Sequence, residues 1–293
     1  MASELEFRHV DVFAEEPFTG NGLIVVFGGT TGVPAEALLE IAIEMRQFES
    51  IFVDVEADGA RVRARIFTAE EELQFAGHPV IGAAAALHER QAAGVAEQSW
   101  VFEIAGRAIP VRSRSTPYYY EAEMNQGIAE IGRPLEGDIA VRFAHMLGLD
   151  RSDLHRLPMQ VVSTGLPYLI VPVARGLDRA QISVGDLGDQ LARIGAKFVY
   201  VLEPASREGR TWDNAGVVED VATGSAAGPV AAYLAAHGLA RADEVVEVNQ
   251  GQFVGRPSKI AVAPDRGGEL WVGGPVAPVA RGAVGLPDEG SRL

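Results

Sequence analysis

The stretch "EDVATGSAAGPVAAYL" (219–234) joins two carboxylates to a run of very small residues and then to an Ala-rich apolar segment. Its last part, "GSAAGPVAAYL" (224–234), has the same length as "GHPVIGAAAAL" (77–87). Each segment begins with Gly and a polar residue, becomes Ala-rich and ends in Leu. Small residues can also serve only to let a helix pack tightly in a core. One matched segment in each half of the chain nevertheless favours a duplicated domain.

The composition narrows the class of protein. A chain of 293 residues suits two domains of about 150 residues each. The net charge of −15 argues against nucleic acid or an anionic membrane as partners, because both require a basic face. A small anionic substrate remains compatible with it, since local dipoles can hold one carboxylate.

The chain contains no cysteine, which rules out disulfides, thiolate nucleophiles and cysteine-ligated metals. The N-terminal sequence has no secretory pattern, and no apolar run is long enough for a membrane-spanning helix. We therefore expect a cytoplasmic protein.

Short alternating apolar runs predict strands in both halves, with helices between them. This mixture predicts an α/β or α+β class. A turn-forming cluster at 115–117 places the predicted boundary between an N-terminal half, 1–116, and a C-terminal half, 117–278. We expect a C-terminal strand from 279–293 to complete the N-terminal half. Helices are predicted at 34–46, 79–90, 138–147, 184–194 and 229–237.

The starts of the two matched segments predict an anion site. Gly77 and Gly224 allow close approach of the backbone, and the first N–H groups of a helix lack partners within the helix. A helix N-terminus also carries about half a positive charge. If the two halves face each other, both ends point into one cleft, which would hold a small carboxylate. The sequence has no dinucleotide or P-loop fingerprint, so no nucleotide cofactor is predicted.

Four polar residues near these segments are candidates for chemistry. Glu49 has apolar neighbours in "MRQFESIFV" (45–53), and desolvation there is expected to raise its pKa toward values useful for acid–base work. It could equally face solvent at a strand edge. His78 could be a capping or core residue, Asp220 an acid that favours a helix start, and Ser225 an N-cap. Their joint placement around two helix starts is what favours a functional interpretation.

Other kinds of site are not predicted. The six histidines show no zinc-binding spacing, so we expect no metal. The nucleophile elbow GxSxG is absent. Arg256, in "NQGQFVGRPS" (249–258), could meet a carboxylate or could anchor a tight turn.

At these motifs the chain resembles the PhzF-like phenazine biosynthesis proteins, which share the diaminopimelate-epimerase-like fold. That fold implies an α+β protein of two similar halves, each a mixed sheet curled around a central helix, with the active site in the cleft between the halves. The resemblance follows the family's order over nearly the whole chain. It is carried by "DVFAEEPFTGNGLIVV" (11–26), "EMRQFESIFV" (44–53), "FAGHPVIGAA" (75–84), "EDVATGSAAG" (219–228) and "QGQFVGRPS" (250–258).

The resemblance implies a cofactor-independent isomerase of a small conjugated carboxylic acid, which works as a homodimer in antibiotic biosynthesis. The catalytic residues that it implies are Glu49, His78, Asp220 and Ser225. The substrate-binding residues that it implies are Asn21, Gly77 and Gly224.

The chain departs from the family pattern at two positions. Gly22 and Val221 stand where the family usually has proline. The resemblance places both beside the implied cleft, so these departures concern the choice of substrate rather than the fold.

Two other functions stay open within the same fold. Racemases and epimerases of this fold use two cysteines, which this chain lacks, so only a Cys-free variant would be possible. The other alternative is a small-molecule-binding protein without catalytic activity. Ligand-dependent thermal stabilisation without turnover would identify such a binder.

Overall fold

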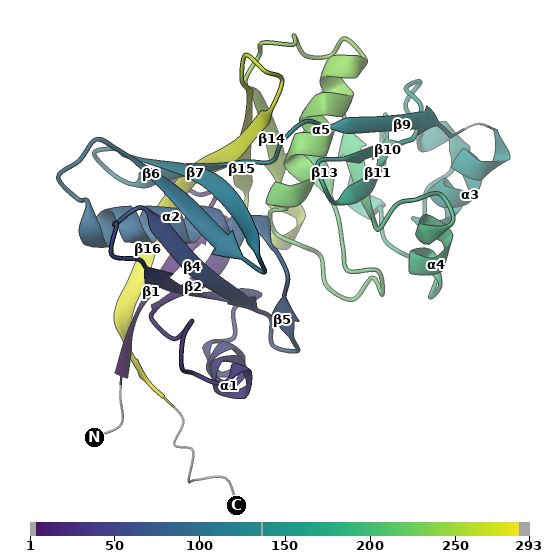
Figure 1. The fold of residues 1–293 in the computed structure, drawn as a ribbon. Coiled ribbons are helices and arrows are strands. Elements are labelled where there is room, and N and C mark those ends of the chain that lie inside the picture. Colours follow the sequence, from purple (N-terminus) through teal and green to yellow (C-terminus); the bar gives the residue numbers. More distant parts are fainter. Residues whose placement is uncertain (1–3, 136, 287–293) are drawn as a thin grey trace, which may run out of the picture. The chain divides into compact units, whose positions relative to one another are not determined.

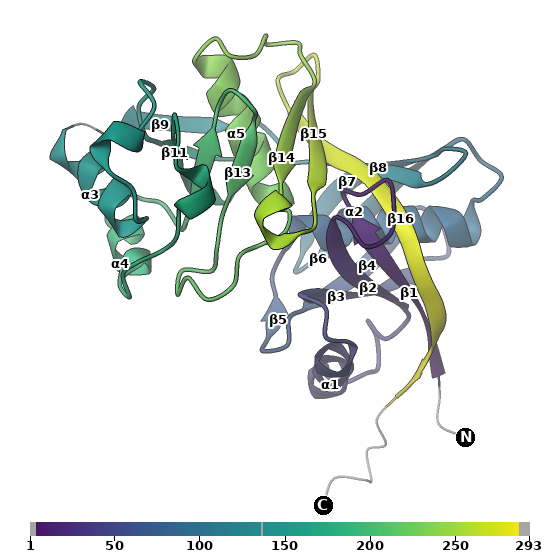
Figure 2. The same cartoon turned by 180° about the vertical axis from the view of Figure 1, so that it is seen from behind.

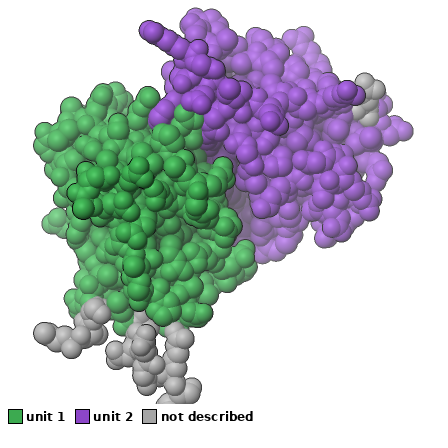
Figure 3. Space-filling view, in the orientation of Figure 1, with its two compact units in different colours: residues 1–125, 273–293 green, residues 126–272 purple. Residues whose placement is uncertain are grey.

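The computed structural model describes residues 4–135 and 137–286, which form two compact units. Unit 1 contains residues up to Asn125 and those from Gly273 onward, and unit 2 runs from Gln126 to Val272 (Figure 3). These divisions lie after the predicted 116 and before the predicted 279. Residues 117–125 stay in unit 1 because a strand there pairs with the preceding strand of that unit. Residues 287–293 of the predicted C-terminal strand lie outside the described residues.

The strands of unit 1 form a closed sheet in the order β16, β1, β2, β3, β4, β6, β7, β8 and back to β16. Strand β16 pairs antiparallel with β1, and the two lie side by side in Figure 2. The strands of this unit are β1 (Glu4–Val12), β2 (Asn21–Phe27), β3 (Glu49–Val55), β4 (Arg61–Phe67), β5 (Glu72–Leu73), β6 (Glu97–Ile104), β7 (Arg107–Ser115), β8 (Tyr120–Asn125) and most of β16 (Leu270–Gly285).

A buried helix, α2 (Gly77–Gln91), runs inside the closed sheet of unit 1 (Figure 1), and α1 (Ala35–Met45) is the second helix of the unit. All side chains of α2 from Gly77 to His88 are buried. The small residues are required by close packing on β1 and β2. A Cβ atom at Gly82 would lie 2.4 Å from Leu23 Cδ2 and 2.8 Å from Val12 Cγ2.

Unit 2 has a mixed sheet in the order β9, β10, β11, β12, β13, β14, β15, which packs against helix α5. Its strands are β9 (Glu130–Pro134), β10 (Gln160–Ser163), β11 (Pro167–Pro172), β12 (Phe198–Glu203), β13 (Glu208–Arg210), β14 (Val246–Gln250) and β15 (Ser258–Pro264). Its α-helices are α3 (Asp138–Met146), α4 (Leu187–Ala192) and α5 (Gly224–Ala236), and its short 3-10 turns are η1 (Arg151–Asp153), η2 (Leu177–Arg179) and η3 (Gln252–Val254).

Helix α5 begins at Gly224, so the predicted start at Pro229 is wrong. Pro229 lies inside the helix, where it has no N–H to donate to the carbonyl of Ser225. The helix tolerates this loss because it is held by packing on the sheet, with Gly228 so close to Gln126 that a Cβ atom would lie 2.3 Å from the amide oxygen.

The α+β class is confirmed, because each unit combines a sheet with one buried Ala-rich helix. Each of these helices begins at the glycine of a matched segment, Gly77 or Gly224. Within the described residues, no helix combines the length and the apolar character needed to cross a membrane.

Candidate active site

Glu49 is the first residue of β3 and is buried, with 7% of its surface exposed. The parallel pairing of β3 with β2 places it beside Leu23. The residues that follow it in the strand are buried too, so β3 has no solvent-facing side at this end. The alternative in which Glu49 faces solvent at a strand edge is therefore wrong.

His78 is the second residue of α2, and its Nδ1 atom lies 3.1 Å from Oε2 of Glu49. Burial lowers the pKa of His78 to about 3, so the imidazole is neutral at neutral pH. Its Nε2 atom is buried and has no hydrogen-bond partner among the described residues. A carboxyl group and a neutral imidazole in contact, away from water, can exchange a proton with a bound molecule.

His88, near the end of the same helix, shows what a structural histidine looks like in this protein. Its Nδ1 atom lies 2.8 Å from Ser113 Oγ and its Nε2 atom 2.9 Å from the carbonyl of Val95. The indole N–H of Trp100 also donates to Ser113 Oγ, at 2.8 Å. Both ring nitrogens of His88 are therefore engaged, whereas the Nε2 atom of His78 has no hydrogen-bond partner among the described residues.

Asn21 begins β2 and is buried, with 2% of its surface exposed. The turn before it requires glycine, because Gly20 has φ +63° and a Cβ atom there would lie 2.4 Å from the carbonyl oxygen of Val12. The departure at Gly22 has a structural counterpart. A Cβ atom at Gly22 would lie 2.3 Å from Oε1 of Gln47, so the Gln47 side chain occupies space that a proline would need.

In unit 2, Asp220 lies just before α5 and accepts a hydrogen bond from a residue that the sequence analysis did not single out. The hydroxyl of Thr223 donates to Asp220 Oδ2 at 2.6 Å. Gln250 holds this segment as well, because its Nε2 atom donates to the carbonyl of Asp220 at 2.7 Å. The only sequence signal for Thr223 and Gln250 was that they lie inside the motifs at 219–228 and 250–258.

Ser225 is the second residue of α5, and its Oγ atom lies 2.7 Å from the hydroxyl of Tyr168. The N-cap of the helix is Thr223, so the N-cap alternative for Ser225 is wrong. Gly224 is buried, and its carbonyl accepts a hydrogen bond from Gln126 Nε2 at 2.8 Å. Tyr168, which is 3% exposed, is a further neighbour that the sequence analysis missed.

Glu219, the other acid of the opening motif, has a structural role. It forms two hydrogen bonds with Arg210, at 2.9 and 2.6 Å. The guanidinium also lies 4.9 Å from the Trp212 ring and 4.7 Å from the Phe253 ring. Glu219 and Asp220, which are adjacent in one motif, thus have different partners.

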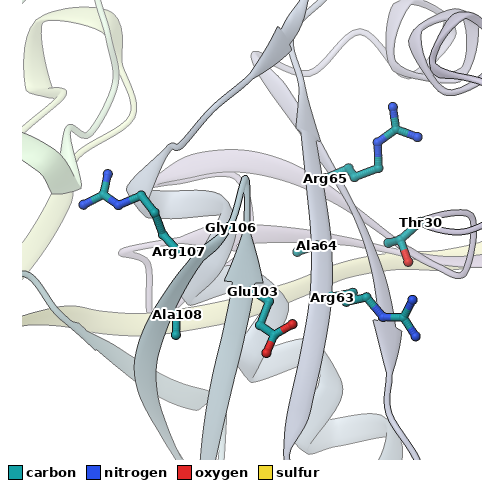
Figure 4. A pocket seen from close by; sticks show the side chains of 8 residues that line it. All are labelled: Thr30, Arg63, Ala64, Arg65, Glu103, Gly106, Arg107 and Ala108. Carbon is teal, nitrogen blue, oxygen red and sulfur yellow. The ribbon is translucent and has the colours of Figure 1, made fainter.

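A pocket of about 390 Å³ in unit 1 contains none of the predicted site residues. The arginines around it point in different directions (Figure 4), and Arg63 and Arg65 are paired with Glu56 and Glu72. Its lining offers no convergent anion site. Among the described residues, no group of three or more His, Cys, Asp or Glu side chains is arranged to hold a metal ion.

Comparison with known proteins decides the family. The sequence model described as "Phenazine biosynthesis-like protein" matches residues 10–274. The chain belongs to this family. The resemblance found in the motifs is therefore confirmed.

Named relatives of the chain in this family are isomerases. The trans-2,3-dihydro-3-hydroxyanthranilate isomerase of Pseudomonas fluorescens is 32% identical, over 85% of this chain and 86% of its own length. The uncharacterized isomerase YddE of Escherichia coli K12 is 32% identical, over 87% and 88%. The solved structure of a predicted epimerase, PA4716 from Pseudomonas aeruginosa, is 48% identical, with a TM-score of 0.89 over 96% of this chain and 99% of that one.

Proposed function

We propose that this protein is a cofactor-independent isomerase of a small conjugated carboxylic acid, with Glu49 as the group that moves the proton. The observation that carries the proposal is the buried contact between Glu49 and the neutral His78, at 3.1 Å. The isomerases among its relatives support the reaction class.

The proposed reaction removes a proton from one carbon of the substrate and returns a proton to another, so the double bond moves and no electrons are gained or lost. A single carboxyl group can do both steps, first as base and then as acid. His78, neutral and beside Glu49, can share the proton between the two steps. Because the chain has no cysteine, the thiol route used elsewhere in this fold is not open.

We assign the substrate carboxylate to the start of α5. The first turn of this helix presents backbone N–H groups and the positive end of the helix dipole. Ser225 adds a hydroxyl in the first turn of α5. A dihydro-hydroxyanthranilate-type acid fits this proposal, as does an unsaturated proline-like acid. The homodimer, the cytoplasmic location and the role in antibiotic biosynthesis stay predictions.

The test is turnover without cofactor. The purified protein, dialysed against a chelator, is incubated with trans-2,3-dihydro-3-hydroxyanthranilate at neutral pH, and the loss of substrate is followed by absorbance and chromatography. We expect enzyme-dependent isomerisation with no added metal or nucleotide. Activity that appears only after a cofactor is added would contradict the proposal.

A second candidate is a Cys-free epimerase, which the description of the 48% identical structure favours. The two functions differ in their products. An epimerase inverts a stereocentre and leaves the double bonds in place, so chiral chromatography of proline-like amino acids after incubation would reveal it. Inversion of an amino acid, with no isomerisation of any conjugated acid, would select the epimerase.

The substitution Ser225→Ala tests the proposed binding role of α5. Loss of one hydrogen bond to the bound acid should weaken binding by about 1 kcal/mol, which is roughly a fivefold rise in Kd. Isothermal titration with the substrate or its product measures this. Ser183→Ala is the matched control in the same unit, because the Ser183 hydroxyl donates to the carbonyl of Met146 at 3.0 Å on the surface. Equal Kd values for the two variants would remove Ser225 from the site.

A further inference from the structure

A chain of side-chain hydrogen bonds crosses unit 2 and ends at Asp220. Tyr200, on β12, lies 3.3 Å from Gln250 Oε1, and Gln250 Nε2 lies 2.9 Å from Thr223 Oγ1. Thr223 in turn contacts Asp220 Oδ2. Tyr200, Gln250 and Thr223 are 0%, 1% and 7% exposed. Polar side chains that are buried to this extent nearly always have hydrogen-bond partners, so these bonds are part of the fold.

In each hydrogen bond of this chain, the group that donates and the group that accepts are determined. The backbone N–H of Thr223 can only donate, and it faces Gln250 Oε1 at 3.2 Å, so the amide of Gln250 cannot be reversed. The Nε2 atom of Gln250 therefore donates to the Thr223 hydroxyl oxygen. That hydroxyl has a single proton, and its remaining partner is Asp220 Oδ2, at 2.6 Å. The Thr223 proton must point at the carboxylate of Asp220.

The backbone next to Gln250 is built to hold this arrangement. Gly251 has φ +89°, and a Cβ atom there would lie 2.3 Å from the carbonyl oxygen of Arg256 and 2.7 Å from that of Val221. Only glycine allows β14 to turn this close to the segment that carries Asp220. Gly251, in the "QG" pair of the motif 250–258, thus allows the close approach of Gln250 to the segment that carries Asp220.

We propose that Thr223 is a positioning residue that holds the Asp220 carboxylate through a donor whose direction Gln250 fixes. The inference rests on the proposed function, together with the catalytic role that the family resemblance implies for Asp220. A threonine that only capped the helix would use its hydroxyl on the N–H groups of α5, whereas no side-chain cap bond is present at Thr223.

The test compares Thr223→Val, which keeps the shape and removes the donor, with Thr223→Ser, which keeps the donor. We expect kcat on trans-2,3-dihydro-3-hydroxyanthranilate to fall about tenfold in Thr223→Val, while KM changes by less than about twofold. Thr223→Ser should recover most of this loss. Thr211→Val is the matched control, because its buried hydroxyl donates to the carbonyl of Val199 and not to Asp220. It should leave kcat near the wild-type value.

A double-mutant cycle separates positioning from general stability. In an Asp220→Ala background the donor has no carboxylate to hold, so adding Thr223→Val should lower kcat no further. Equal losses from Thr223→Val in both backgrounds would overturn the inference.

Crystal structures of the two Thr223 variants give a readout that does not depend on turnover. Asp220 should adopt a different side-chain rotamer in Thr223→Val and the native one in Thr223→Ser. An unmoved Asp220 in Thr223→Val would overturn the inference even if Glu49 proves essential. Conversely, a fully active Glu49→Gln enzyme would refute the proposed function and leave this structural result standing.

Discussion

Glu49→Gln is expected to lower turnover by at least about 10²-fold while ligand binding survives. Glutamine keeps the shape and one oxygen of the side chain but cannot take up or release a proton. Steady-state kinetics on trans-2,3-dihydro-3-hydroxyanthranilate measures the first effect, and titration calorimetry measures the second. Asp220→Asn should lower turnover less than Glu49→Gln does.

The matched control for this substitution is Glu123→Gln. Glu123 lies on β8 of the same unit, and burial raises its pKa. It is a partly buried glutamate, 38% exposed and 3.5 Å from Arg112, that has no place in the proposed site. If the two variants lost equal activity, the effect would come from general perturbation of unit 1 and the assignment of Glu49 would be wrong.

Glu219→Gln is expected to destabilise unit 2 by about 3 kcal/mol. The Glu219 and Arg210 side chains are each only 10% exposed, so the guanidinium would be left buried without its counter-charge. Its other bonds, to the carbonyls of Leu177 and Asp178, do not neutralise it. Denaturant unfolding of the two-unit chain, followed with a spectroscopic probe in unit 2, measures the loss in the free energy of unfolding.

The control for this loss is an exposed pair in the same unit. Arg241 and Asp243 lie 3.1 Å apart with side chains 78% and 81% exposed, so Asp243→Asn should leave the unfolding midpoint unchanged. An unfolding curve for Glu219→Gln that overlaid that of Asp243→Asn would show that the buried pair contributes nothing to stability.

The sequence was sufficient to predict the elements around the site but not all of their limits. An apolar run predicted a strand at 50–55, which the structure begins one residue earlier, at Glu49. The predicted helix, 79–90, begins at Gly77 in the structure and so includes His78. Strand β9 was not predicted because "EIGRP" (130–134) is exposed and has no alternation. The predicted C-terminal strand, 279–293, overlaps β16, but the first part of β16 was missed because its Gly, Ala and Pro residues are poor strand formers. Pairing with β1 holds them in the sheet.

The candidate residues were predictable as types, whereas their partners were not. Both acids of "ED" (219–220) fit a helix start equally well, and only the tertiary contact with Arg210 distinguishes the structural Glu219 from Asp220. Thr223 and Gln250 are distant in sequence, and their bond depends on where β14 ends relative to α5. No local pattern carries that information.

The central claim is that Glu49 itself carries the proton between substrate carbons. Mass spectrometry of the product formed in D₂O tests it most directly, because Glu49 can return only the proton that it has just taken up, or one deuteron that replaces this proton by exchange with solvent between the two steps. The account predicts at most one carbon-bound deuterium per product molecule with the wild-type enzyme and almost no product with Glu49→Gln. Product that forms at the wild-type rate with Glu49→Gln, or that carries more than one carbon-bound deuterium with the wild-type enzyme, would contradict it.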